Sequence, residues 1–169
     1  MFKIKNLLNF IFSIFLSLCR LTHHRTLVFF YILKIIIVIK PDNKYLLFKR
    51  AMFHDIDKFK WNAVKCFGEN YFDLKKVEYN SPEYEKIISR IKPIIKKHHS
   101  TNRHHPEYFD NNYDGMSEID KFEMIADWIS ASKLQKNGNI FQSIEKNQNR
   151  FLYDDEEKRK LRKIVLKIL

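Results

Sequence analysis

The sequence predicts an all-α protein, and three observations carry that prediction. Only three glycines and four prolines occur in 169 residues, hydrophobic residues make up 45% of the chain, and Lys, Glu, Ile and Leu are abundant. Strand-and-turn folds need more turn-forming residues than this. A chain of this length builds one domain with a real core, so we expect one active centre.

Residues 1–40 differ in composition from everything that follows. A short basic start precedes the apolar run 7–21, which resembles a signal peptide or signal anchor but is shorter than the roughly 20 residues a bilayer requires. A second apolar run, 27–39, stops at the turn signal Pro41-Asp42-Asn43. Two interpretations stay open: two packed N-terminal helices, or one membrane-associated anchor followed by a core helix. Residues 41–169 form the expected main domain.

Apolar spacing and capping residues predict the helices of this domain. We expect a helix over 44–54 that delivers His54 and Asp55 at its end, and a loop over 68–81. A second helix begins at Ser81-Pro82 and runs to about His99, with a kink at Pro93.

The C-terminal part is expected to begin with an irregular stretch over 100–116. Ser117 then caps the clearest helix, 117–132, with Asp120 three residues on as the second half of a capping box. The tail over 140–169 reads as two helices split near Asp154-Asp155.

The net charge of +11 does not by itself predict a nucleic-acid partner. The lysines are scattered, without the aromatic-interleaved stripe that single-strand binders use. Cys19 and Cys66 are too few for a disulfide framework, which favours a reducing compartment. We therefore expect a cytoplasmic protein, with membrane association through residues 1–40 as the alternative.

The histidines carry the main chemical signal. Four of the seven are His98, His99, His104 and His105, and His54 stands directly before Asp55. Imidazoles and carboxylates bind Mn, Fe, Co, Ni and Zn, and such a site hydrolyses substrates when one position is left for water. The alternative interpretation is a solvated loop with incidental metal affinity.

Two acidic residues on the helix over 117–132 are also candidate site residues. Glu123 and Asp127 are spaced i, i+4 and lie on one side of the helix. Asp127 stands beside Trp128 at the buried edge, where an uncompensated carboxylate is costly. A metal ion would resolve that cost, and so would an ion pair with Arg103 or a lysine.

Three local strings resemble known motifs. His54-Asp55-Ile56-Asp57-Lys58-Phe59 resembles an HDLSKF motif, 98–108 resembles an H-x3-N-x-HHPE motif, and 123–128 resembles an EM-x-x-DW motif. Their order is similar to that of the HD superfamily of metal-dependent phosphohydrolases, and more closely to an uncharacterised HD-like family of phages and bacteria. The match covers about residues 45–135.

This resemblance implies an HD-like helical bundle and a set of residue roles. His54, Asp55 and Asp127 would bind a divalent transition metal, with His98, His104 and His105 as further ligands or phosphate-facing residues. Glu123 would orient a ligand histidine, and Lys58 would meet a substrate phosphate unless it is a solvated surface lysine. The implied activity is hydrolysis of a phosphorylated small molecule, including nucleotides, through metal-bound hydroxide.

One departure from the HD pattern bears on activity. HD proteins take another histidine about 20 residues before the His-Asp pair, where this chain has Leu33 to Ile36. His23 and His24 lie about 30 residues upstream, beyond that spacing. The alternative to a hydrolase is therefore a catalytically degenerate HD-like protein that serves as a membrane-peripheral or interaction module.

Overall fold

The computed structural model describes residues 2–77 and 81–169, and within them every regular element is helical. The all-α prediction is confirmed. The chain divides into two compact units, each assembled from two separate segments: unit 1 comprises Met1–His23 and Asp55–His98, and unit 2 comprises His24–His54 and His99–Leu169.

The first helix, α1, runs without interruption over Phe2–Val38. It joins the two apolar runs, which both interpretations had assigned to separate elements, so the predicted division of residues 1–40 into two elements is wrong. The intervening Thr22-His23-His24-Arg25 contains neither Gly nor Pro, and nothing in it stops a helix. Its Asn6–Val38 part is long and apolar enough to cross a membrane by length and composition. Each run taken alone was too short for that.

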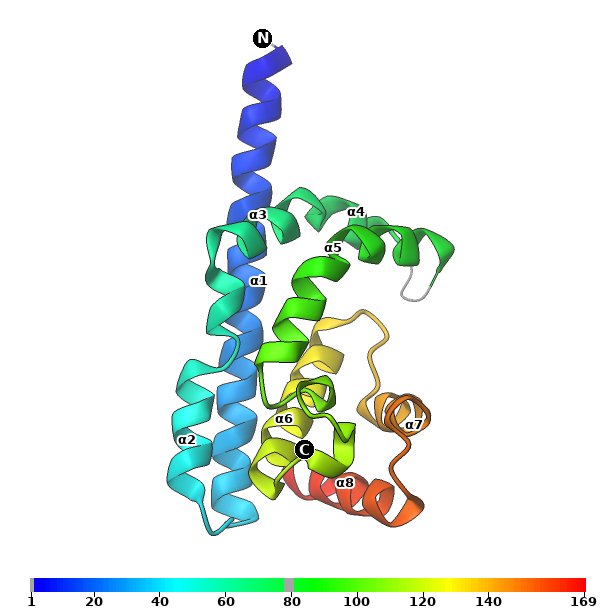
Figure 1. The fold of residues 1–169 in the computed structure, drawn as a ribbon. Helices are drawn as coiled ribbons and strands as arrows, with labels where there is room; N and C mark the ends of the chain where they lie inside the picture. The colour runs from blue at the N-terminus through cyan, green and yellow to red at the C-terminus, as the bar shows by residue number, and fades with distance from the viewer. Residues whose placement is uncertain (1, 78–80) are drawn as a thin grey trace. The chain divides into compact units, whose positions relative to one another are not determined.

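In unit 2 the end of α1 and the following helix form an antiparallel hairpin (Figure 1). The turn after α1 leads to α2, Lys44–Phe53, whose N-cap Asn43 accepts a hydrogen bond from the Leu46 backbone N–H at 3.3 Å. Phe29 and Phe48 meet edge to face across the hairpin, with ring centroids 5.8 Å apart. The predicted helix over 44–54 is confirmed.

The centre of unit 2 is α6, Glu118–Leu134, which contacts α2, α7 and α8. Its start carries the predicted capping box, because Ser117 accepts from the Asp120 backbone N–H and Asp120 accepts from the Ser117 backbone N–H. Helix α6 is buried on several sides, including Met124, Ile125 and Ile129 at 0% exposure. Side chains on this helix are therefore fixed by packing.

The remainder of unit 2 is formed by the chain from His99 onward. After two 3-10 turns, η2 (Pro106–Tyr108) and η3 (Asn112–Gly115), the tail folds as α7 (Ile140–Phe151) and α8 (Asp155–Ile168). Asp154 caps α8 by accepting from the Glu157 backbone N–H at 2.7 Å. The predicted irregular stretch and the predicted split near Asp154 are both confirmed.

The core of unit 2 lies between α1, α2, α6, α7 and α8. Its members at 0% exposure are Val28, Ile32, Ile35, Leu47, Met124, Ile125, Ala126, Ile129, Ile144 and Val165. Because α6 contributes to this core from several sides, its polar residues Glu123 and Asp127 lie next to packed apolar side chains. The core thus sets the positions of these two carboxylates.

Unit 1 contains the start of α1, the 3-10 turn η1 (Ile56–Phe59), α3 (Trp61–Glu69), α4 (Tyr71–Lys76) and most of α5 (Pro82–Thr101). The expected loop over 68–81 is wrong for its first half, where α4 forms with Asp73 in its first turn and lysines in its last, as the helix dipole favours. Residues 78–80 of that expected loop lie outside the described residues. Helix α5 continues through Pro93.

Candidate metal centre

His54 and Asp55 stand where α2 ends. His54 is the C-cap of the helix, with φ −50° and ψ 131°, and Asp55 adopts the left-handed conformation, with φ 55° and ψ 22°. A non-glycine residue in that region is uncommon and is retained where the surroundings enforce it, often at functional sites. The two residues therefore leave the helix and turn the chain into η1.

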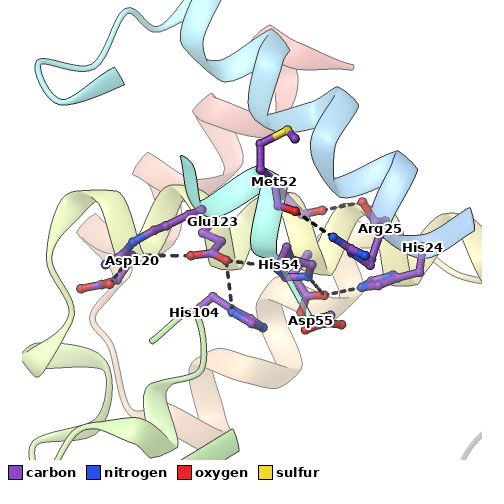
Figure 2. A network of polar contacts seen from close by, with 12 residues as sticks. His24, Arg25, Met52, His54, Asp55, His104, Asp120 and Glu123 are labelled. Carbon is purple, nitrogen blue, oxygen red and sulfur yellow. Dashed lines mark hydrogen bonds and ion pairs between the residues drawn. The ribbon is translucent and has the colours of Figure 1, made fainter. Parts of the chain in front are cut away.

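Within unit 2, three helices bring His24, His54 and Asp127 together. The Asp127 Oδ1 atom lies 2.9 Å from Nε2 of His24 and 3.6 Å from Nε2 of His54. The rings of His24 and His54 are 5.7 Å apart between centroids (Figure 2). Each of the three offers a ligand atom within 4.8 Å of the other two. Helices α1, α2 and α6 thus each supply one donor to a common point.

Glu123 stands between two of the histidines, as Figure 2 shows. Its Oε1 atom lies 3.0 Å from Nδ1 of His54 and 3.3 Å from Nδ1 of His104, and the two rings are 4.3 Å apart. An imidazole that donates its Nδ1–H to a carboxylate is oriented to coordinate a metal through Nε2. Glu123 therefore has the contacts of an orienting carboxylate for both rings.

Charged side chains next to Glu123 hold its carboxylate in place. Arg50 of α2 pairs with Asp120 and reaches Oε2 of Glu123 at 3.5 Å. Asp120, fully buried, also accepts two hydrogen bonds from the Arg103 guanidinium, each 3.1 Å long. The ion pair with Arg103 that was one interpretation of Asp127 is thus made by Asp120, whereas Asp127 faces histidines.

Both carboxylates of this site are held in the ionised state. Burial raises the pKa of Glu123, but hydrogen bonds from His104 and His54 outweigh burial and lower it to about 2. Burial likewise raises the pKa of Asp127, and the hydrogen bonds from His24 and His54 outweigh it, so this pKa falls well below its ordinary value. An anionic carboxylate is the form that binds a metal ion.

His105 belongs to a neighbouring group in unit 2. Its ring stacks on His99 with centroids 4.1 Å apart and lies 4.1 Å from the ring of His104. His99 Nδ1 lies 3.0 Å from Glu107 Oε1, and Arg150 pairs with the same oxygen. His99, His105 and Glu107 also offer ligand atoms within 4.8 Å of one another. Residues 98–108 therefore contribute to two adjacent polar groups. His104 belongs to the group around Glu123, and His105 belongs to the group with His99 and Glu107.

Unit 1 holds Asp55, Lys58 and His98 of the expected set. His98 lies between two carboxylates, with Nε2 3.1 Å from Asp55 Oδ1 and Nδ1 2.9 Å from Asp57 Oδ2. Lys58 donates to Asp55 Oδ2 at 2.6 Å, so it is ion-paired. Burial raises the pKa of Asp57, and the hydrogen bond and charge of His98 outweigh burial and lower it.

The structure thus groups His54, His104 and Asp127 in unit 2, with His105 beside His104, and groups Asp55 with His98 and Lys58 in unit 1. Sequence reasoning missed His24, since the usual spacing pointed to Leu33–Ile36. In the structure Ile35 and Ile36 at that place belong to the core or pack against it. The signal that could have found His24 is the absence of a helix breaker between the two apolar runs.

The donor set is compatible with a bound metal ion. Two imidazole nitrogens and a carboxylate oxygen converge within buried surroundings, and a second carboxylate faces the opposite nitrogen of His54. These are the ligands and the supporting contact that such ions take in proteins. The buried groups of unit 2 could therefore hold a metal ion.

Comparison with known proteins assigns the chain to a family. Neither a curated protein nor a solved structure matches it. A family model matches residues 14–169, which include every candidate ligand named above. The chain therefore belongs to DUF5662, a family of unknown function.

Proposed function

We propose that this protein is a metal-dependent hydrolase of a phosphorylated small molecule, with nucleotides as the first class to test. The observation that carries the proposal is the convergence of His24, His54 and Asp127 from three helices of unit 2. The order of motifs, similar to that of HD phosphohydrolases, supports the same reaction class.

His24, His54 and Asp127 would hold the ion. The resemblance adds Asp55, the next residue after His54 in the chain, as a further ligand. Glu123 would keep the His54 and His104 rings turned so that their Nε2 atoms serve as donors, because it accepts at both Nδ1 atoms. Glu123 is thus a positioning residue.

A bound divalent ion supplies Lewis acidity, which activates water near neutral pH and neutralises charge on a phosphate oxygen. The chain's own residues position it: the core fixes α6, and the Arg50 and Asp120 pair restrains Glu123. The resemblance would make Lys58 and His98 phosphate-facing. In unit 1 Lys58 is ion-paired with Asp55, and His98 lies between Asp55 and Asp57. In this proposal His24 would take the place of the upstream histidine, whose absence from Leu33–Ile36 suggested a degenerate protein.

Elemental analysis of protein purified without chelators tests the proposal. We expect about one equivalent or more of Mn, Fe, Co, Ni or Zn in the wild type, and a strong loss in His54→Ala and Asp127→Ala. His23→Ala is the matched control, since His23 is exposed and adjacent to His24. Folded, metal-free wild-type protein that takes up none of these ions would overturn the metal site.

Activity against a panel of nucleotides and sugar phosphates tests the reaction separately. We expect phosphate release that requires the metal and disappears in Asp127→Ala. A metal-loaded wild-type protein that releases no phosphate from any member of the panel would favour the degenerate scaffold instead.

A further inference from the structure

The first part of α1 presents an apolar stripe, defined as Leu7, Leu8, Ile11, Phe12 and Phe15. All five side chains are between 54% and 60% exposed. Their spacing of i, i+1, i+4, i+5 and i+8 confines them to an arc of about 140° on the helix, at 3.6 residues per turn. Five large apolar side chains on one arc form a contiguous patch of the kind that marks an interaction surface.

The opposite face of the same helix segment is packed within unit 1. Ser13 and Ser17 are 4% and 3% exposed, and Ile14 lies against α3 at Gly68, where an added Cβ would come within 2.5 Å of the Ile14 side chain. If the first part of α1 separated from the rest of unit 1 to span a membrane, lipid would surround it. Ser13 and Ser17 would then lie in hydrocarbon. With Ser13 and Ser17 buried on this face and Ile14 against α3 beside it, the helix suits a position in the plane of a membrane surface.

The surroundings of the apolar stripe match an anionic lipid surface. Phe12 contacts Phe72 of α4 with ring centroids 6.3 Å apart, and the exposed Lys75 and Lys76 follow in the last turn of that helix. Elsewhere in unit 1, Trp61 at the start of α3 is 64% exposed. Exposed Trp is typical of the interfacial zone of a bilayer, and each Lys near the surface is attracted to anionic headgroups.

We infer that unit 1 docks in the plane of an anionic phospholipid membrane through the apolar stripe, with the α4 lysines facing the headgroups. This inference is independent of the proposed hydrolysis, because none of the stripe residues belongs to the candidate metal centre. It assigns to α1 a role at the membrane surface instead of a transmembrane span.

Vesicle flotation of the full-length chain tests the inference. The probe is a set of liposomes of phosphatidylcholine with 30% phosphatidylserine, compared with phosphatidylcholine alone. We expect the wild type to float with the anionic vesicles, to bind the neutral ones weakly, and to dissociate as salt is raised, since screening weakens attraction to headgroups.

The stripe variant Leu8→Glu/Phe15→Glu should bind anionic vesicles at least about tenfold less tightly, since it replaces two apolar anchors with charges. The matched control is Ile37→Glu/Leu166→Glu, which changes two side chains 68% and 70% exposed in unit 2 and alters the net charge equally. Because all four positions are exposed, circular dichroism should show every variant folded.

Three outcomes would overturn the inference. The wild type could remain unbound at low salt, or the stripe variant could float as well as its control. A third contrary result is a wild-type dimer that binds no vesicles and becomes monomeric in the stripe variant by sedimentation equilibrium, which would assign the stripe to a second copy of the chain.

Discussion

The Nε2 atom of His54 lies 3.6 Å from Oδ1 of Asp127, across the junction of α2 and α6 in unit 2. The two residues are 73 positions apart in the sequence (127 − 54), and the core of unit 2 brings them together. A single ion between a nitrogen and an oxygen at this separation would need only a small adjustment to reach metal-ligand distances of about 2 Å.

His24→Ala should lower metal affinity at least about tenfold, because the variant removes an imidazole that faces the Asp127 carboxylate. Isothermal titration with Zn²⁺ or Mn²⁺ after removal of bound metal measures the change. His23→Ala, one residue away and exposed, should bind like the wild type. Equal affinity in His24→Ala and His23→Ala would remove His24 from the ligand set.

Glu123→Gln should weaken metal binding about 10–100-fold while leaving the ligand histidines in place, because a neutral amide orients imidazole less strongly than a carboxylate. The same titration measures it. Glu118→Gln on the exposed start of α6 is the control for loss of one negative charge on this helix. An effect of the same size in both variants would show that Glu123 acts only through net charge.

Asp120→Asn should destabilise the protein by about 2–4 kcal/mol at neutral pH, because it leaves Arg50 and Arg103 without their buried carboxylate. Burial raises the pKa of Asp120, but Arg103, Ser117 and Arg50 outweigh it and lower that pKa. The carboxylate therefore stabilises the fold above its ordinary pKa, and this contribution is lost as pH falls through the lowered value.

Urea unfolding of wild type and Asp120→Asn across the acid range measures the pH dependence. The difference in unfolding free energy should be largest at neutral pH and shrink in acid. A difference that is constant with pH would show that the wild-type carboxylate is not the stabilising species.

Ile32→Ala should destabilise the protein by about 2–5 kcal/mol, because Ile32 is fully buried in the core of unit 2 and its loss leaves a cavity. Ile37→Ala, on the same helix but 68% exposed, should change the free energy of unfolding by about 0.5 kcal/mol or less. Thermal or urea unfolding distinguishes them. Similar losses in both variants would contradict the placement of α1 against this core.

The sequence by itself determined the all-α class, the helix over 44–54, the Ser117 capping box and the split of the tail at Asp154. These depend on composition, capping residues and apolar periodicity, which act over a few residues. The clustering of histidines also singled out His54 and His104, and the position of a carboxylate beside Trp128 singled out Asp127, because chemical type is written directly in the sequence.

Tertiary structure alone decided which of these residues meet. The stretch between the two apolar runs lacks a helix breaker, but that does not show what His24 meets. Only the packing of the continuous α1 in unit 2 brings His24 to Asp127. The partners of Asp120 and Asp127 were likewise settled by packing of α6 against α2, since an i, i+4 spacing shows that side chains share a helix face and not what that face meets. Contacts between distant segments depend on how the whole core closes, which no local pattern encodes.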